Sequence, residues 1–295
     1  MTTSRRHNRS RRGTPRTPLM SRIWPVAVIA LVLFTGLLIV KFVSSRDARA
    51  ENRPAAAGSA AAPHYDNLEI AEYAAAPSSP RRHVDYEGFT LSFNPANHTP
   101  DWVGWELLGS EASGNVSRTN NFWQDTDVAG CPSPYDYKNS GYDKGHLCPA
   151  ADQKWSREAM LDCFVMTNMA PQEHALNAGA WQTLEKKERL WAERDSAIVI
   201  VAGPIYTDAD TARIGDTGVR VPSAFYKVLL APYVESPRAI GFIYPNMTSP
   251  GNMENYALTV DEVEEITGLD FFSSLPDEIE NKVESIKSFT EWNRR

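Results

Sequence analysis

The chain has 295 residues, enough for one large domain or two small ones, and 42% of them are hydrophobic, as in a globular protein. Charge is divided unevenly, because eleven of the 30 Lys and Arg residues but only two of the 37 Asp and Glu residues lie in residues 1–53. The remainder carries a net charge of about −16, which argues against avid, non-specific nucleic-acid binding through phosphate neutralisation.

A basic, Arg-rich segment at residues 1–22 precedes an uncharged apolar run over residues 23–40. Its length is close to the ~20 residues that cross a bilayer, so we predict a transmembrane helix over residues 23–43. The positive-inside rule then leaves the basic tail in the cytoplasm and the rest extracytoplasmic, in a periplasm or on a cell surface. A cleavable signal peptide is the alternative, because residues 48–50 (ARA) resemble a small-residue cleavage site.

Residues 44–81 are rich in Ala, Pro and Ser and poor in large apolar side chains. This composition predicts a linker, with residues 65–73 as a transient helix. The folded domain is therefore expected to occupy residues 82–295.

Hydrophobic patterning within this domain predicts short strands and helices. The expected strands are 88–93, 102–108, 163–167, 197–202, 222–230 and 239–243. The expected helices are 156–161, 173–194, 260–267 and a last one from 276 towards 292, while 110–140 is rich in loop residues. Ser156 and Thr259 are the expected caps of the first and third of these helices. Strands that come first and helices that then lie between strands indicate an α+β fold, and they disfavour a doubly wound parallel sheet.

Three cysteines, Cys131, Cys148 and Cys163, fit no zinc-binding spacing. An extracytoplasmic compartment favours a disulfide. Cys131 and Cys148 bracket one loop and are the candidate pair, although the other pairings and three free thiols stay open. No GxSxG motif is present, which disfavours a serine hydrolase.

His146 differs from the other five histidines because Asp143, Lys144 and Gly145 precede it directly. An imidazole with an ordinary pKa of about 6.5 can accept a proton from water near neutral pH. Gly145 permits an unusual backbone angle or a close approach. His146 is therefore the candidate general base.

Asn177 and Glu185 lie eight positions apart on one predicted helix, which separates them by about 80° of rotation. An amide carbonyl and a carboxylate are hard oxygen donors that suit Mg²⁺. The alternative is an ordinary solvated helix, since charged residues follow Glu185 directly. Asn168 lies in a turn with Asn and Pro, a composition that is also typical of a plain connector.

Three linked motifs resemble the DNA/RNA non-specific endonuclease family, the ββα-metal nucleases that include endonuclease G. The family's Asp-Arg-Gly-His corresponds to residues 143–146, its Ser/Thr-Asn-x-x-Pro-Gln to 167–172 and its Asn-x-Gly-x-Trp-x-x-Leu-Glu to 177–185. The loop at 118–125 also matches. The resemblance covers roughly residues 83–275, and three motifs in the right order are highly specific.

The resemblance implies a central antiparallel sheet flanked by helices and a metal-dependent endonuclease that cleaves DNA and RNA with little sequence preference, leaving 5′-phosphate ends. His146 would be the general base. Asn177 would bind Mg²⁺, with Mn²⁺ as an alternative ion, and Glu185 would hold the waters of that ion. Asn168 would support the site.

Lys144 departs from the family pattern, which has Arg there. Lysine keeps the charge but lacks the bidentate fork, so slower turnover or an altered grip on substrate is expected. Arg118 is a second substrate-binding candidate. Some members of the family dimerise, so a homodimer is an open alternative.

Two other functions fit parts of the sequence. A metal phosphodiesterase for a smaller substrate suits the acidic body better. A non-catalytic surface binding protein on a nuclease scaffold would keep the fold without the activity.

Overall fold

The computed structural model describes residues 71–73, 82–209, 211–249, 251–287 and 289–294. Its centre is a seven-stranded sheet in which all neighbouring strands are antiparallel. In spatial order the strands are β12 (Ala257–Leu258), β11 (Arg238–Pro245), β10 (Ala224–Ala231), β7 (Ala197–Ile205), β4 (Thr99–Leu108), β3 (Phe89–Asn94) and β2 (Arg82–Tyr86).

The sheet is covered on both faces, which explains why its middle strand, β7, is apolar throughout. In β7, Ile198 and Ile200 belong to one hydrophobic core, while Val199 and Val201 belong to the other. Successive side chains of a strand point to opposite faces, so a strand with two covered faces has no polar side. The antiparallel sheet therefore separates two cores.

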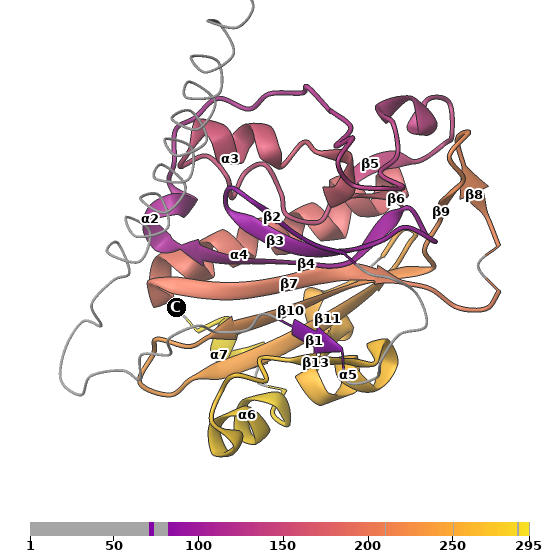
Figure 1. Cartoon of the computed structure of the whole chain (residues 1–295). Coiled ribbons are helices and arrows are strands. Elements are labelled where there is room, and N and C mark those ends of the chain that lie inside the picture. The colour runs from indigo at the N-terminus through magenta and orange to yellow at the C-terminus, as the bar shows by residue number, and fades with distance from the viewer. Residues whose placement is uncertain (1–70, 74–81, 210, 250, 288, 295) are drawn as a thin grey trace, which may run out of the picture. The chain divides into compact units, whose positions relative to one another are not determined.

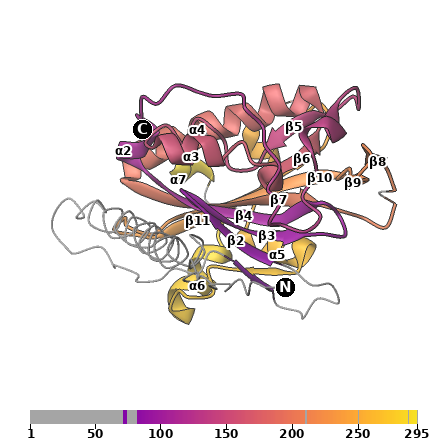
Figure 2. The same ribbon diagram turned by 45° about the horizontal axis from the view of Figure 1, so that its top comes forward.

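One face, called here the site face, carries a two-stranded antiparallel sheet and two helices (Figures 1 and 2). The small sheet pairs β5 (Asp143–His146) with β6 (Met169–Gln172), and the helices are α3 (Arg157–Asp162) and α4 (Gln182–Asp195). The opposite face, called here the back face, carries α5 (Val260–Thr267) and α6 (Asp277–Glu284), with β13 (Leu269–Phe271) paired to β1 (Ala71–Tyr73) (Figure 1).

Shorter elements complete the described part of the chain. They are α2 (Gly109–Ala112), α7 (Phe289–Trp292), the pair β8 (Arg213–Ile214) and β9 (Val219–Arg220), and 3₁₀ turns at Pro134–Tyr137, Met166–Asn168 and Met253–Tyr256. Trp292 of α7 stacks edge-on against Trp191 of α4, with ring centroids 5.1 Å apart, so the end of the chain joins the core of the site face.

The α+β class with a large antiparallel sheet is confirmed, as are most of the predicted elements. Both predicted caps are formed: Ser156 accepts hydrogen bonds from the backbone at the start of α3, and Thr259 does the same for α5. These caps work through local chemistry, which is why the sequence alone located the two helix starts.

Three predicted elements were wrong in detail. Residues 163–167 do not form a sheet strand, because Val165 makes only one bridge, to Trp123, before the 3₁₀ turn. An apolar buried run has the same pattern whether or not it pairs with a strand. The predicted helix at 173–194 is a π-helical turn followed by α4, and the predicted last helix is divided into α6 and α7.

The predicted linker contains β1, so Ala71–Tyr73 is a strand where a transient helix was expected. Within the described ranges, no helix is long and apolar enough to cross a membrane. The predicted transmembrane segment at residues 23–43, the basic tail before it and the rest of the linker lie outside the described residues. The anchor and the location of the protein remain predictions.

Candidate active site

The predicted motif Asp143–His146 is a strand, and its partner β6 is the second predicted motif. Gly145 faces Ala170 across this two-stranded sheet. A Cβ at Gly145 would lie 2.5 Å from Gln172 Oε1 and 3.0 Å from the Ala170 carbonyl oxygen, so only glycine fits. The close approach brings the second motif to His146, which is paired with Met169.

His146 lies at the end of β5 between two aromatic rings. The ring centroids of Phe164 and Phe122 are 4.9 and 5.6 Å from the imidazole centroid. The pKa of His146 is lowered to about 3, mainly by burial and also by the charge of Arg118, while a hydrogen bond to the Lys144 backbone opposes the shift. Its Nε2 atom is buried without a hydrogen-bond partner among the described residues. The imidazole is therefore neutral at physiological pH.

Asn177 lies in the π-helical turn Leu176–Trp181, just before the break at Gly179. Its Nδ2 donates a hydrogen bond of 2.8 Å to Asp143 Oδ2, which also lies 2.8 Å from His174 Nδ1. Because the amide nitrogen is held by a carboxylate, the carbonyl oxygen Oδ1 is the atom left to bind a cation. π-turns within helices often occur at functional sites.

Glu185 is half-buried in the first turns of α4. Burial raises the pKa of Glu185 to about 7; Lys227 opposes this rise, and the nearby Glu188 and Asp152 carboxylates add to it. The eight-residue spacing of Asn177 and Glu185 was predicted from an uninterrupted helix. The π-turn between them changes that phase, yet both residues line one pocket.

An open pocket of about 490 Å³ brings five of the predicted site residues together. These are Arg118, Lys144, His146, Asn177 and Glu185. Asn120, Phe122, Tyr142, Asp143 and Gln182 also line it. The pocket therefore contains a neutral imidazole, two oxygen donors and two cations.

The two cations rest on aromatic rings at the rim of this pocket. Lys144 Nζ lies 4.9 Å from the centroid of Phe122 and 5.9 Å from that of Tyr137, and the Arg118 guanidinium lies 5.0 Å from the centroid of Phe164. Rings in these positions hold a cation without neutralising it. Both side chains keep their charge for an anionic ligand.

Asn168 does not line the pocket. Its Nδ2 donates to the carbonyls of Cys148 and Cys163, and its Oδ1 accepts from the Cys148 amide, all at 2.9 Å. The side chain thus fastens the segment after His146 to the end of α3. This geometry makes Asn168 a positioning residue.

Comparisons with known proteins identify the chain's relatives. The sequence model of the DNA/RNA non-specific endonuclease family matches residues 69–278. The chain belongs to this family. It is therefore an endonuclease that hydrolyses nucleic acid.

A nuclease of Nostoc sp. (strain PCC 7120 / SAG 25.82 / UTEX 2576) is 33% identical over 212 residues, 67% of this chain and 75% of the relative. The mitochondrial nuclease EXOG of Xenopus laevis is 34% identical over 209 residues, but the match spans only 58% of that relative and 64% of this chain. A solved structure of the EndoG/EndoGI complex matches with a TM-score of 0.61 and 26% identity, covering 66% of this chain and 86% of that one.

The endonuclease has a buried charge network beneath the pocket that sequence reasoning did not assign. Lys227 is fully buried in β10 and donates a 2.9 Å hydrogen bond to Glu188 Oε2. Arg189 donates a 2.8 Å hydrogen bond to the buried Asp152. The one signal was a lysine in an otherwise apolar strand, AFYKVLLA.

The predicted disulfide between Cys131 and Cys148 is not formed. All three cysteines are free, buried thiols. Cys131 Sγ contacts the Pro132 carbonyl oxygen at 3.7 Å, whereas Cys148 Sγ accepts a 3.0 Å hydrogen bond from Gln153 Nε2. The loop before β5 is held by packing and hydrogen bonds, so sequence position alone was a poor guide to pairing.

Proposed function

We propose that the chain is a divalent-metal-dependent endonuclease of low sequence specificity that cleaves DNA and RNA and leaves 5′-phosphate ends. Mg²⁺ is the proposed ion, with Mn²⁺ as an alternative. The observation that carries the proposal is the single pocket that His146, Asn177 and Glu185 line together. The proposed fold is the ββα-metal arrangement, here β5, β6 and α4.

The donor set fits a hydrated Mg²⁺. Asn177 offers a carbonyl oxygen whose orientation is fixed through Asp143, and Glu185 offers a carboxylate for bound water. Mg²⁺ gives up its waters reluctantly and is usually held by few protein ligands. When bound there, the ion would stabilise negative charge on the phosphate and on the leaving 3′ oxygen.

His146 would accept the proton of the attacking water through a ring nitrogen. A base must be within hydrogen-bond reach of that proton, and the imidazole lines the same pocket as the proposed metal ligands. A pKa of about 3 makes the imidazole a weak base in the protein alone. A phosphate anion beside the ring would raise that pKa and strengthen the base.

Lys144 and Arg118 would hold the substrate phosphates. Both carry a full charge at the rim of the pocket, which supplies a local basic surface on an acidic body. Contacts to phosphate carry no sequence information, which supports low specificity. Binding that rests on few cations should be modest and should weaken with salt.

Cleavage of three substrates by the full chain would test the proposal. Plasmid DNA and single-stranded RNA should be cut in Mg²⁺, and bis(p-nitrophenyl) phosphate should be a poor substrate. The DNA fragments should be joined by ligase without prior treatment with a kinase, because 5′ ends carry phosphate. Preference for the small diester would support the smaller-substrate phosphodiesterase, and binding without cleavage would support the binding protein.

The location of the enzyme is a separate proposal that rests on the sequence. An apolar run that follows a basic tail favours a single-pass anchor with the catalytic domain outside the cytoplasm. Alkaline extraction of membranes tests it, since an anchored enzyme stays in the pellet. A homodimer also remains a prediction.

A further inference from the structure

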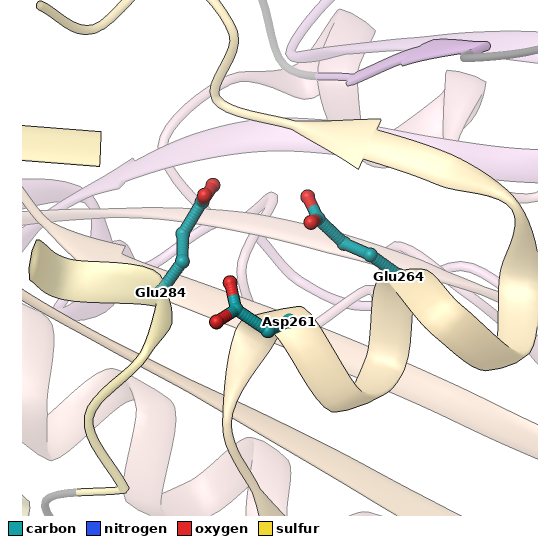
Figure 3. Close-up of side chains that lie close together, drawn as sticks. All are labelled: Asp261, Glu264 and Glu284. Atoms are coloured by element: carbon teal, nitrogen blue, oxygen red, sulfur yellow. The ribbon is translucent and has the colours of Figure 1, made fainter. Parts of the chain in front are cut away.

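Three carboxylates converge on the back face of the sheet, away from the pocket (Figure 3). Asp261 and Glu264 lie one turn apart on α5, and Glu284 is the last residue of α6. One oxygen from each lies within 4.8 Å of the other two. Figure 3 shows the three side chains pointing toward a common point between the two helices.

Glu284 is the observation that points to a ligand. Glu284 is 6% exposed, and its Oε1 atom is buried without a hydrogen-bond partner among the described residues. A buried carboxylate oxygen that has lost its water and gained no donor is costly. A bound ligand at this oxygen would offset that cost.

Glu264 is fixed in place for such a ligand. Its Oε1 accepts a 2.7 Å hydrogen bond from the Phe271 backbone amide in β13, which leaves Oε2 for a second partner. In the described part of the chain, no Lys or Arg forms an ion pair with Asp261, Glu264 or Glu284. The three carboxyl groups lack a cation of the chain.

The surroundings of the cluster are also acidic. The pKa of Glu284 is raised to about 9, first by burial and then by the charges of Glu264, Glu280, Asp261 and Asp270. The pKa of Glu264 is raised to about 7, again mainly by burial, and the Phe271 backbone hydrogen bond opposes this rise.

We propose that Asp261, Glu264 and Glu284 bind one divalent cation of the calcium class, at a site separate from the active site. Ca²⁺ binds oxygen at 2.3–2.6 Å, so it can bridge oxygens separated by up to about 5 Å. Mg²⁺ binds at 2.0–2.1 Å and bridges only about 4.2 Å. The oxygens, all within 4.8 Å of one another, lie inside the reach of Ca²⁺, whose flexible coordination accepts carboxylates and water together.

The proposed ion would tie α5 to α6. Water would complete its coordination from the side of Asp261, which is exposed to solvent. Val283 of α6 and Val263 of α5 both belong to the core of the back face. Bound Ca²⁺ would therefore stabilise this layer of the enzyme and leave the chemistry of the pocket to its own ion.

Calorimetric titration of CaCl₂ into the full chain tests the proposal, in a background of Asn177→Ala that removes the proposed ligand of the active site. We expect one Ca²⁺ per chain. Glu284→Gln should weaken binding at least tenfold. The matched control Glu278→Gln changes an exposed residue of the same helix and should leave binding unchanged.

Thermal unfolding in the same background gives the second readout. Saturating Ca²⁺ at about 100 times Kd should raise Tm by about 5 °C or more relative to EDTA, and Glu284→Gln should abolish that rise. Asp261→Asn changes an exposed side chain and provides the same comparison if Glu284→Gln fails to fold. Absence of Ca²⁺ binding, or binding that both variants leave intact, would overturn the proposal.

Discussion

The two faces of the central sheet bury carboxylates in opposite ways. On the site face, Glu188 and Asp152 are each hydrogen-bonded to a cation supplied by the chain, Lys227 and Arg189. On the back face, Glu284 and its neighbours on α5 have no such cation among the described residues. The same residue type is therefore compensated internally on one face and left uncompensated on the other.

Whether the chain itself neutralises a buried carboxyl group distinguishes a structural role from a ligand-binding role. A buried charge that the chain neutralises itself gives a fixed platform, and here that platform lies directly beneath Glu185 in α4. A buried charge that the chain does not neutralise leaves room for a proton or an ion. The platform thus supports the active site, whereas the back face contains the carboxyl cluster that we propose as a Ca²⁺ site.

The largest effect on stability is expected from breaking the platform. Lys227→Met removes the cation from Glu188 and should lower the free energy of unfolding by about 3–5 kcal/mol, because a buried carboxylate is left alone. Denaturant unfolding measures this loss. The double variant Lys227→Met/Glu188→Gln should recover most of it, and equal losses in the single and double variants would show that the pair is not coupled.

A smaller effect on activity is expected at the rim of the pocket on the site face. Lys144→Met removes one of its two cations and should lower kcat/KM on plasmid about 10- to 100-fold, since a charge-assisted phosphate contact is lost. Lys144→Arg adds a bidentate fork and should raise kcat/KM. Steady-state cleavage at fixed salt measures both, and unchanged kcat/KM in Lys144→Met would remove this residue from the substrate site.

Removing a charged group from the back face should not lower the free energy of unfolding, unlike its removal from the platform. In EDTA, Glu284→Gln replaces an uncompensated buried carboxylate and should leave the enzyme as stable as the wild type or about 1 kcal/mol more stable. Denaturant unfolding with and without Ca²⁺ measures the effect. A loss as large as that of Lys227→Met would show that a cation of the chain neutralises Glu284 after all.

The effect that is smallest at physiological pH concerns the titration of His146, and it grows only in acid. His146 has a folded-state pKa of about 3, below its ordinary value of 6.5, so between these values the unfolded chain binds a proton that the folded chain does not. The stability from this group is complete above pH 6.5 and declines as pH falls toward 3. His146→Asn should unfold with a shallower decline over this range. Parallel curves for the two proteins would mean that the imidazole is not desolvated.

The sequence predicted the parts of this enzyme that depend on local chemistry. The caps at Ser156 and Thr259 fixed two helix starts, and alternating or continuous apolar residues identified β3, β4, β7, β10 and β11. Five of the predicted site residues line one pocket. They could be named from the sequence because the linked motifs indicate a family whose fold brings such residues together.

Features that depend on distant contacts were not predictable. The strand β5 carries the residues DKGH, which do not alternate, and it is a strand only because β6 pairs with it. The π-turn before α4 leaves no periodic signal that distinguishes it from a regular helix. The partner of Lys227 lies 39 residues away, and the cysteine pairing depended on distances that spacing does not give.

Plasmid cleavage by the full chain in Mg²⁺ or in EDTA, beside His146→Ala, tests the central claim most directly. We predict cleavage by the wild type in Mg²⁺, none in EDTA, and a loss of about 10²- to 10⁴-fold in His146→Ala, as expected when a general base is removed. The variant should unfold at nearly the same denaturant concentration as the wild type at pH 7. Undiminished cleavage by His146→Ala would contradict the assignment of the base and, with it, the account of the pocket.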